Sequence, residues 1–337
     1  MTLIELLNDE IKGNPLRMIL GEALGNDFEK WDVNDNKSVK KLYNRLKYDN
    51  MPKTIKELVE CDFKNQCLRK GVKDEPEDSL WTFIKYKRYG GSFDCDRCKL
   101  ANSIYRTLWG WTPKKRSPNA IEDSLKQAWE ELGTNSDTMN SFATTFRRAL
   151  AKSESSYLRE YTNAWYSTID NQYANTKIYE RLCKDYPQIK DFAKYTHTIG
   201  NFTLIPFKLR AEDSNGFNAC RGYSKIPNNK YFVCDYWDLS LQLIKDAAPN
   251  PELFEDYINS FYLFDYVNSD GIISLFDRHR EYINKNEFKP LEENAENFLP
   301  NSIGELNQYI ERVVEIIRDR GTLMVIILML KKLKEKE

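Results

Sequence analysis

The sequence predicts a mainly helical fold with one small β-element, which places it in the α+β class. Apolar residues recur at spacings of three and four over most of the 337 residues, which is the pattern of amphipathic helices. Only Phe202 to Pro206 alternates as a strand does, directly after the turn residues Gly200 and Asn201. The apolar and aromatic content is sufficient for a substantial core, so we expect a globular protein.

Three helices are expected near the N-terminus. The first carries apolar residues at positions 4, 7 and 11 and stops before Pro15. The second covers residues 16–24 and stops near Gly25, and the third covers residues 38–47. Five further helices are expected at residues 118–132, with Gly133 as its stop, and at residues 139–169, 236–247, 251–267 and 272–284. Asn268 to Gly271 is predicted to form the turn between the last two.

The final helix is expected to begin at Ser302, which has the spacing of a capping box with Glu305. Gly321 is expected to interrupt it. From Leu323 to Leu330 the chain is apolar on every face, so this tail is predicted to be buried, either in its own core or against a second subunit. We favour association of two copies through this tail.

The chain shows no internal repeat and no flexible linker, so a domain boundary is expected near residue 117 or not at all. Residues 1–117 form an N-terminal helical region with a basic aromatic segment, and residues 118–337 form a helical domain. No secretory signal is recognisable, and the longest apolar run is far shorter than the roughly 20 residues of a membrane span. A cytoplasmic location with no membrane partner is therefore expected. The seven cysteines are irregularly spaced, which favours free thiols.

The net charge is −1, but the charge is unevenly distributed. The segment from Trp81 to Arg116 contains nine basic and two acidic residues. The segment from Asp246 to Pro300 contains twelve acidic and four basic residues. This asymmetry indicates either a surface that attracts an anionic partner or two parts of the protein that attract each other.

Two segments in the basic region have possible ligands. Cys95 and Cys98 have the spacing of half a zinc site, but the sequence offers no clear second half, so no metal site is predicted and incidental thiols are favoured over zinc or a redox dithiol. A second segment interleaves cations with aromatic rings, as in proteins that bind single-stranded nucleic acid. Its alternative is an amphipathic element with core rings. The nucleic-acid candidates are Lys85, Tyr86, Lys87, Arg88 and Tyr89.

The catalytic candidates are His197, Asn218 and Arg221, which we expect to converge on one concave surface. An imidazole titrates near neutrality and suits a general base or a phosphate contact, and a guanidinium fork matches phosphate oxygens. Each also has a structural alternative, such as a histidine that caps a turn. His279, the only other histidine, lies among charged residues and is predicted to be exposed. No cofactor motif is present, so no cofactor is predicted and enzymatic activity stays open.

Two resemblances rest on these motifs. His197 to Leu204 resembles the His-x-x-Gly-Asn-Leu-x-Leu segment in the C-terminal nuclease domain of modification-dependent restriction enzymes, a branch of the His-Asn-His endonucleases. In that family an upstream motif provides the catalytic histidine, whereas no histidine precedes His197 here.

Residues 195–276 are similar over a longer stretch to an uncharacterised bacterial and phage family of unknown function. The shared pattern is Thr-Ile-Gly-Gly or Thr-Ile-Gly-Asn, a hydrophobic-Pro pair, Asn-x-x-Arg-Gly, an Asp-x-x-Asp-Leu-Ser/Thr-Leu-x-x-Ile helix, a Tyr-x-x-Phe-Phe-like segment and a Gly-hydrophobic-hydrophobic end. In this chain the pattern falls at Thr198 to Asn201, Ile205-Pro206, Asn218 to Gly222, Asp235 to Ile244, Tyr257 to Phe264 and Gly271 to Ile273.

The expected function is therefore a nucleic-acid- or nucleotide-directed effector in conflict between bacteria and phages, as a defence protein or a toxin, without complete His-Asn-His nuclease chemistry. The alternative is a non-catalytic protein that binds a protein partner, or a structural homo-oligomer.

Overall fold

The computed structural model describes residues 1–8, 10–11, 13–63, 99–111, 132–140, 184, 187–208, 236–277, 279–280 and 302–335. Over these residues the fold is mainly helical with a few short antiparallel strands, which confirms the predicted fold class. None of the helices among these residues is long and apolar enough to cross a membrane. The predicted domain boundary near residue 117 lies outside the described residues and stays a prediction.

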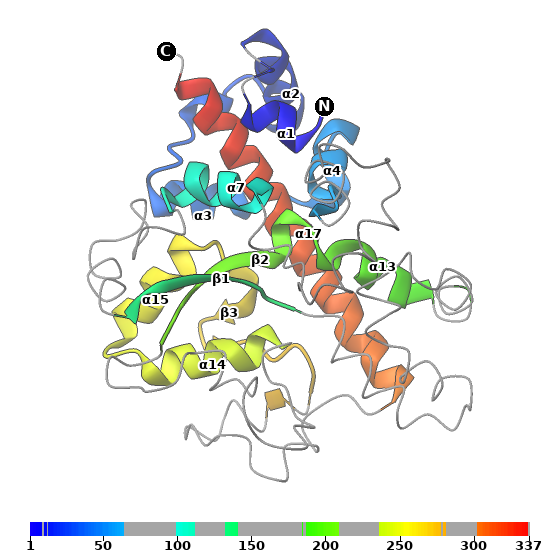
Figure 1. The fold of residues 1–337 in the computed structure, drawn as a ribbon, viewed down its shortest axis with the longest axis vertical. Helices are drawn as coiled ribbons and strands as arrows, with labels where there is room; N and C mark the ends of the chain where they lie inside the picture. Colours follow the sequence, from blue (N-terminus) through cyan, green and yellow to red (C-terminus); the bar gives the residue numbers. More distant parts are fainter. Residues whose placement is uncertain are drawn as a thin grey trace, which may run out of the picture.

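Among the described residues the longest helix is α17 (Ile303–Lys334), which runs through the middle of the described elements to the C-terminal end (Figure 1). Its 32 residues correspond to a length of about 48 Å. The Ser302 side chain accepts a hydrogen bond from the amide of Glu305, as expected for the predicted cap. The helices that pack against α17 include α1 (Leu3–Leu7), α2 (Asn14–Leu24), α3 (Asn36–Tyr43), α4 (Lys53–Val59), α7 (Lys99–Trp109) and α13 (Pro187–Thr196).

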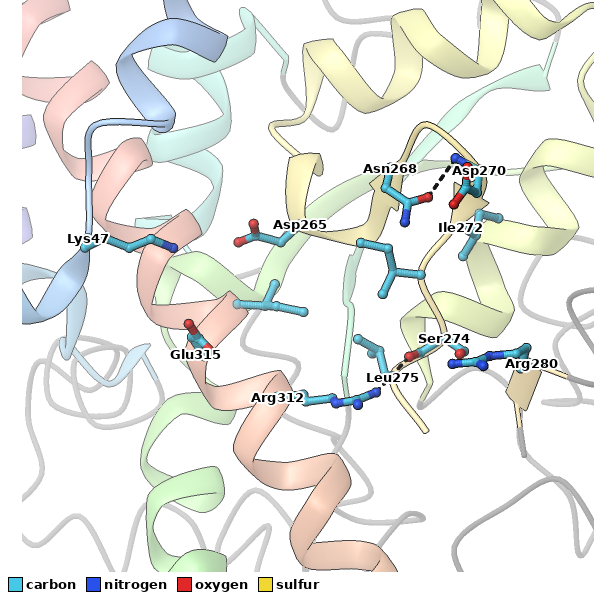
Figure 2. Close-up of a pocket in the computed structure, with 12 residues that line it drawn as sticks. Lys47, Asp265, Asn268, Asp270, Ile272, Ser274, Leu275, Arg280, Arg312 and Glu315 are labelled. Carbon is cyan, nitrogen blue, oxygen red and sulfur yellow. Dashed lines mark hydrogen bonds between the residues drawn. The ribbon is translucent and has the colours of Figure 1, made fainter. Parts of the chain in front are cut away.

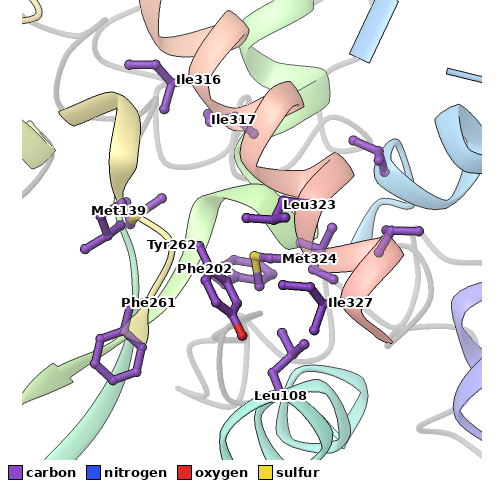
Figure 3. Packing of buried hydrophobic residues seen from close by; sticks show 14 of the residues in the cluster. Leu108, Met139, Phe202, Phe261, Tyr262, Ile316, Ile317, Leu323, Met324 and Ile327 are labelled. Atoms are coloured by element: carbon purple, nitrogen blue, oxygen red, sulfur yellow. The ribbon is translucent and has the colours of Figure 1, made fainter. Parts of the chain in front are cut away.

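The apolar tail, Leu323 to Leu330, is buried within its own chain, so the prediction of burial is confirmed (Figure 3). The elements of the same chain bury this tail, so its burial does not require a second copy, and the expected association of two copies stays a prediction. The predicted interruption at Gly321 is wrong, since α17 continues through it. The roughly 1 kcal/mol by which glycine disfavours a helix is small beside the packing of this segment.

The N-terminal helices follow their sequence signals. Thr2 and Glu5 form a capping box at α1, and α2 ends at Gly25, whose φ of 86° suits a residue without a Cβ. The third helix, α3 (Asn36–Tyr43), is shorter than predicted, because the chain then turns into the 3-10 helix η2 (Tyr48–Asn50). A second 3-10 turn, η1 (Phe28–Lys30), connects α2 to α3.

The predicted strand exists as β2 (Phe202–Pro206), and it pairs antiparallel with β1 (Thr134–Thr138). All five residues of β2 are buried. The sequence did not reveal β1, because Thr-Asn-Ser-Asp-Thr has no apolar alternation. Its pairing with Thr134 aligned to Pro206 supplies the backbone hydrogen bonds that β2 needs in the core.

A second small sheet joins β3 (Val267–Asn268) to β4 (Gly271–Ile272) through the turn that the sequence predicted. The helix expected at residues 251–267 is shorter than predicted, and the helix expected at residues 272–284 is wrong over residues 272–277, which form the end of β4 and a non-helical segment. The first of these, α15 (Pro251–Ser260), ends before Tyr262, whose φ of 57° is incompatible with a helix, and the 3-10 turn η6 (Phe264–Tyr266) follows. In contrast, α14 (Trp237–Ala247) agrees with its prediction. Most of the helices expected at 118–132 and 139–169 lie outside the described residues.

Candidate functional site: a pocket beside the β3–β4 hairpin

The Thr198 to Asn201 motif is a structural junction in this fold. It forms the 3-10 turn η4 (Ile199–Asn201), which crosses α17 so closely that a Cβ on Gly200 would lie 1.9 Å from the carbonyl oxygen of Ile317. Across the crossing lies Gly321, whose own Cβ would stand 3.4 Å from Gly200. Two glycines therefore let the two backbones touch, which explains why both occur here.

Asn201 connects this turn to the end of β1. Its amide nitrogen donates to the carbonyl oxygens of Asn140 and Thr196, at 2.7 and 2.8 Å, and its Oδ1 accepts from the backbone amide of Asn140 at 3.0 Å. Asn140 in turn donates to the Tyr266 hydroxyl and accepts from the Tyr309 hydroxyl. Both asparagines are fully buried, so this network fixes the junction rather than contacting a ligand.

Arg320 fastens the same junction from α17. Its guanidinium donates to the carbonyl oxygens of Gly200, Phe202 and Phe261 at 2.7–3.1 Å. Burial lowers the pKa of Arg320 to about 10. These contacts give the charged side chain an architectural role, since its donors are used on backbone carbonyl groups of η4, β2 and the end of α15.

The predicted catalytic residues are only partly placed. His197 is half-buried at the end of α13, where its carbonyl oxygen accepts a hydrogen bond from the amide of Phe63 at 2.9 Å. Asn218 and Arg221 lie outside the described residues, so their convergence with His197 stays a prediction. The same holds for Lys85, Tyr86, Lys87, Arg88 and Tyr89, and for Cys95 and Cys98.

A cavity of about 670 Å³ lies between α17 and the β3–β4 hairpin (Figure 2). Its volume is within the range of about 300–1,000 Å³ that is typical of small-molecule sites. We call it the hairpin pocket and define it by its lining residues: Lys47, Asp265, Asn268, Asp270, residues 272–275, Arg280, Arg312, Glu315 and Ile316. A smaller cavity of about 350 Å³ adjoins it and shares Leu275 and Arg312.

Two arginines form the basic side of the hairpin pocket. Arg280 follows the hairpin in the chain and Arg312 comes from α17, and in Figure 2 their guanidinium groups point toward each other beside Ser274. Arg312 donates to the carbonyl oxygen of Ser274 at 3.2 Å. Within the described residues neither arginine forms an ion pair, so their charges are available to an anionic group.

The opposite side of the pocket is acidic. Burial, and then the negative charges of Asp319 and Glu315, raise the pKa of Asp265 to about 7. The hydroxyl of Tyr43 donates to the Asp265 carboxylate. Lys47 is paired with Asp319, with 2.6 Å between Nζ and Oδ2, and this hydrogen bond raises the pKa of Lys47. Asp265 therefore changes its charge near neutral pH at a position where it faces the cavity.

A buried carboxylate lies behind the wall of this pocket. Asp238 and His279 are both fully buried, and Asp238 Oδ2 lies 2.7 Å from His279 Nδ1 and accepts from the amide of Leu275 at 2.8 Å. The rings of Tyr236 and Phe276 pack edge-on against the imidazole. The prediction that His279 is exposed is wrong: Asp277 and Arg280 are exposed, whereas the imidazole is buried against the carboxylate of Asp238 on α14.

Sequence reasoning missed the hairpin pocket because its residues come from three distant parts of the chain: Lys47, residues 265–280 and α17. The turn at Asn268 to Gly271 was recognised, but nothing in the sequence places it beside α17. One usable signal existed: Arg312 and Glu315 are spaced by three on α17, next to the buried Ile316, so both border its apolar face.

Comparison with known proteins returned no match to any family model, curated protein or solved structure. The two resemblances stated for residues 195–276 therefore remain expectations.

Proposed function

We propose that this protein binds a nucleotide in the hairpin pocket. The observation that carries the proposal is the pair of arginines, Arg280 and Arg312, which face each other across one end of a cavity of about 670 Å³. Guanidinium groups bind phosphate oxygens with paired, charge-assisted hydrogen bonds. A phosphate at this end is the anion that best matches their geometry.

The rest of the lining suits the other parts of a nucleotide. Asp265, Asp270 and Asn268 offer oxygen acceptors for ribose hydroxyls and base amino groups, and Ile272 and Ile316 offer apolar surface. The lining carries three acidic and three basic side chains: Asp265, Asp270 and Glu315, and Lys47, Arg280 and Arg312. Such a balance favours a single nucleotide over a long nucleic acid, because a polyanion would bring further phosphates against the carboxylates.

The wider role that we propose is a nucleotide-directed effector in conflict between bacteria and phages. This part rests on the family resemblance of residues 195–276, and the pocket adds a ligand class to it. Expression in a bacterial host tests it: wild-type protein should slow growth or protect against phage, and a variant with both arginines replaced by alanine should do neither. An effect that survives the double substitution would separate the role from the pocket.

Isothermal titration with AMP and adenosine tests the binding proposal directly. Wild-type protein should bind AMP more tightly than adenosine, and Arg280→Ala or Arg312→Ala should weaken AMP binding by about tenfold or more, as expected for a lost charge-assisted hydrogen bond. Arg106→Ala is the matched control, because Arg106 is exposed on α7 and does not line the pocket. Equal affinity for AMP and adenosine would reject the proposal.

A further inference from the structure

The buried Asp238 carboxylate occupies a special place relative to the two arginines of the hairpin pocket. Its Oδ2 accepts two hydrogen bonds, one from the amide of Leu275 at 2.8 Å and one from Nδ1 of His279 at 2.7 Å. Leu275 directly follows Ser274, whose carbonyl oxygen holds Arg312, and His279 directly precedes Arg280. The bond to Leu275 therefore lies one residue from the carbonyl group that binds Arg312. The bond to His279 lies one residue from Arg280.

We propose that Asp238 is a positioning residue, which fixes Arg280 and Arg312 in register with each other for a phosphate group. The inference rests on the proposed nucleotide function and goes beyond it, because Asp238 lies behind the wall and does not line the cavity. A single carboxylate on α14 sets the position of both guanidinium groups, although one belongs to the hairpin segment and the other to α17.

Burial makes the hydrogen-bonded pair of Asp238 and His279, which we call the clamp, rigid. Asp238 and His279 have no exposed surface, and the imidazole is enclosed by the rings of Tyr236, Phe276 and Tyr309. A charge-assisted hydrogen bond in such surroundings is stronger than one in water, because the local dielectric constant is low. Among the described residues, Asp238 Oδ1 and His279 Nε2 have no hydrogen-bond partner, so the pair has no competing polar contact there that would pull it to another geometry.

An architectural explanation alone fits less well. Large apolar side chains already fill the core around α14, including Trp237, Leu239, Leu241 and Leu243. A buried polar pair contributes little net stability compared with apolar residues of similar size, but its hydrogen bonds specify a geometry. The geometry specified here is the path of residues 274–280, which is the part of the pocket wall that carries one arginine and holds the other.

Titration of AMP and adenosine into wild type, Asp238→Ala and Asp238→Asn tests the inference. Asp238→Ala should weaken AMP binding by about tenfold or more and change adenosine binding by less than about twofold, since only the phosphate contact depends on the arginines. Asp238→Asn, which keeps one oxygen acceptor, should restore part of the affinity for AMP. Equal loss for AMP and adenosine, or no loss for either, would overturn the positioning role.

Tyr257→Phe is the control for general destabilisation, because it removes a buried hydrogen bond to the carbonyl oxygen of Leu204 in the core. Tyr257→Phe should lower the melting temperature about as much as Asp238→Ala but leave the affinity for AMP unchanged. This result would separate a positioning role of Asp238 from a general loss of stability. An equal loss of AMP affinity in Tyr257→Phe would count against Asp238.

The guanidinium NMR signals provide a readout that does not need a ligand. The signals of Arg280 and Arg312 are assigned because each is missing from the spectrum of the Arg280→Ala or the Arg312→Ala variant. Asp238→Ala should shift both signals, whereas Tyr257→Phe should leave both unchanged. Unshifted signals would overturn the inference even if AMP binds. Shifted signals in a protein that binds AMP and adenosine equally would instead reject the nucleotide proposal and retain the clamp.

Discussion

At the scale of single residues, Gly200 shows how a sequence motif can be conspicuous for a structural reason. A Cβ at this position would collide with the carbonyl oxygen of Ile317 at 1.9 Å and with the amide nitrogen of Gly321 at 2.8 Å. Both atoms belong to the backbone of a long buried helix, so neither can move without displacing α17. The motif Thr-Ile-Gly-Asn is therefore explained by a close crossing of two backbones.

Gly200→Ala is expected to destabilise the protein by about 3 kcal/mol or more, at the upper end of the range for overpacked cores. Urea unfolding followed by circular dichroism measures the change. Gly304→Ala is the matched control, because a Cβ there meets nothing within 4 Å and alanine favours a helix over glycine by about 1 kcal/mol. A Gly200→Ala protein as stable as wild type would refute the close crossing.

Asp265, which lines the hairpin pocket, makes the stability of the protein depend on pH. Burial and the charges of Asp319 and Glu315 raise its pKa to about 7, whereas an aspartate in an unfolded chain titrates near 3.9. The folded chain thus retains a proton that the unfolded chain has lost, so this group lowers the free energy of unfolding as the pH rises from about 4 to about 7. Above pH 7 the contribution is constant.

Asp265→Asn removes that titration. We expect the melting temperature of the variant, relative to wild type, to be higher at pH 8 than at pH 5, since only wild type loses stability in between. Thermal unfolding at both pH values measures the difference. A relative melting temperature that is independent of pH would contradict the raised pKa.

At the scale of elements, the β1–β2 pair depends on a few polar contacts at its end. Asn201 makes three hydrogen bonds to backbone groups of Asn140 and Thr196, all in the buried core. Asn201→Ala leaves these groups without their partner, and we expect a loss of about 3 kcal/mol together with faster hydrogen exchange in β1. Asn44→Ala, at an exposed position after α3, should change stability by less than about 0.5 kcal/mol. Unaltered exchange in β1 would contradict the account.

The sequence predicted elements where local signals agree with tertiary structure. The stripe in α2, the cap at Ser302 and the strand after Gly200 are all present because each depends on neighbours a few residues apart. Predictions failed where partners are distant. The polar strand β1 is a strand because its backbone pairs with that of β2. His279 is buried where its imidazole contacts the carboxylate of Asp238 on α14. The hairpin pocket combines Lys47, residues 265–280 and α17, a set that no local pattern can bring together.

At the scale of the whole molecule, α17 organises the fold. Helices from the N-terminal part and the middle of the chain and the η4 turn pack on it, and its residues 323–329 have no exposed surface. Deletion of residues 322–337 would expose the partners of this helix, including the carbonyl oxygens of Thr107 and Leu108 that Lys331 now binds. The tail is therefore part of the core.

We expect the protein lacking residues 322–337 to have no cooperative unfolding transition. A chain that ends at Lys334 keeps α17 whole and should melt close to wild type, which makes it the control. Calorimetry of both proteins measures the outcome. A folded truncated protein that has merely changed from a dimer to a monomer would instead show that the tail serves association.

The hairpin pocket is the central claim at this scale, because it joins the N-terminal segment, the hairpin and α17 around one cavity. A crystal structure of the protein soaked with AMP tests it most directly. The account predicts the phosphate within hydrogen-bond distance of the guanidinium groups of Arg280 and Arg312, with the ribose toward Asp265 and Asp270. AMP bound elsewhere, such as beside His197, or an empty hairpin pocket at saturating AMP, would contradict it.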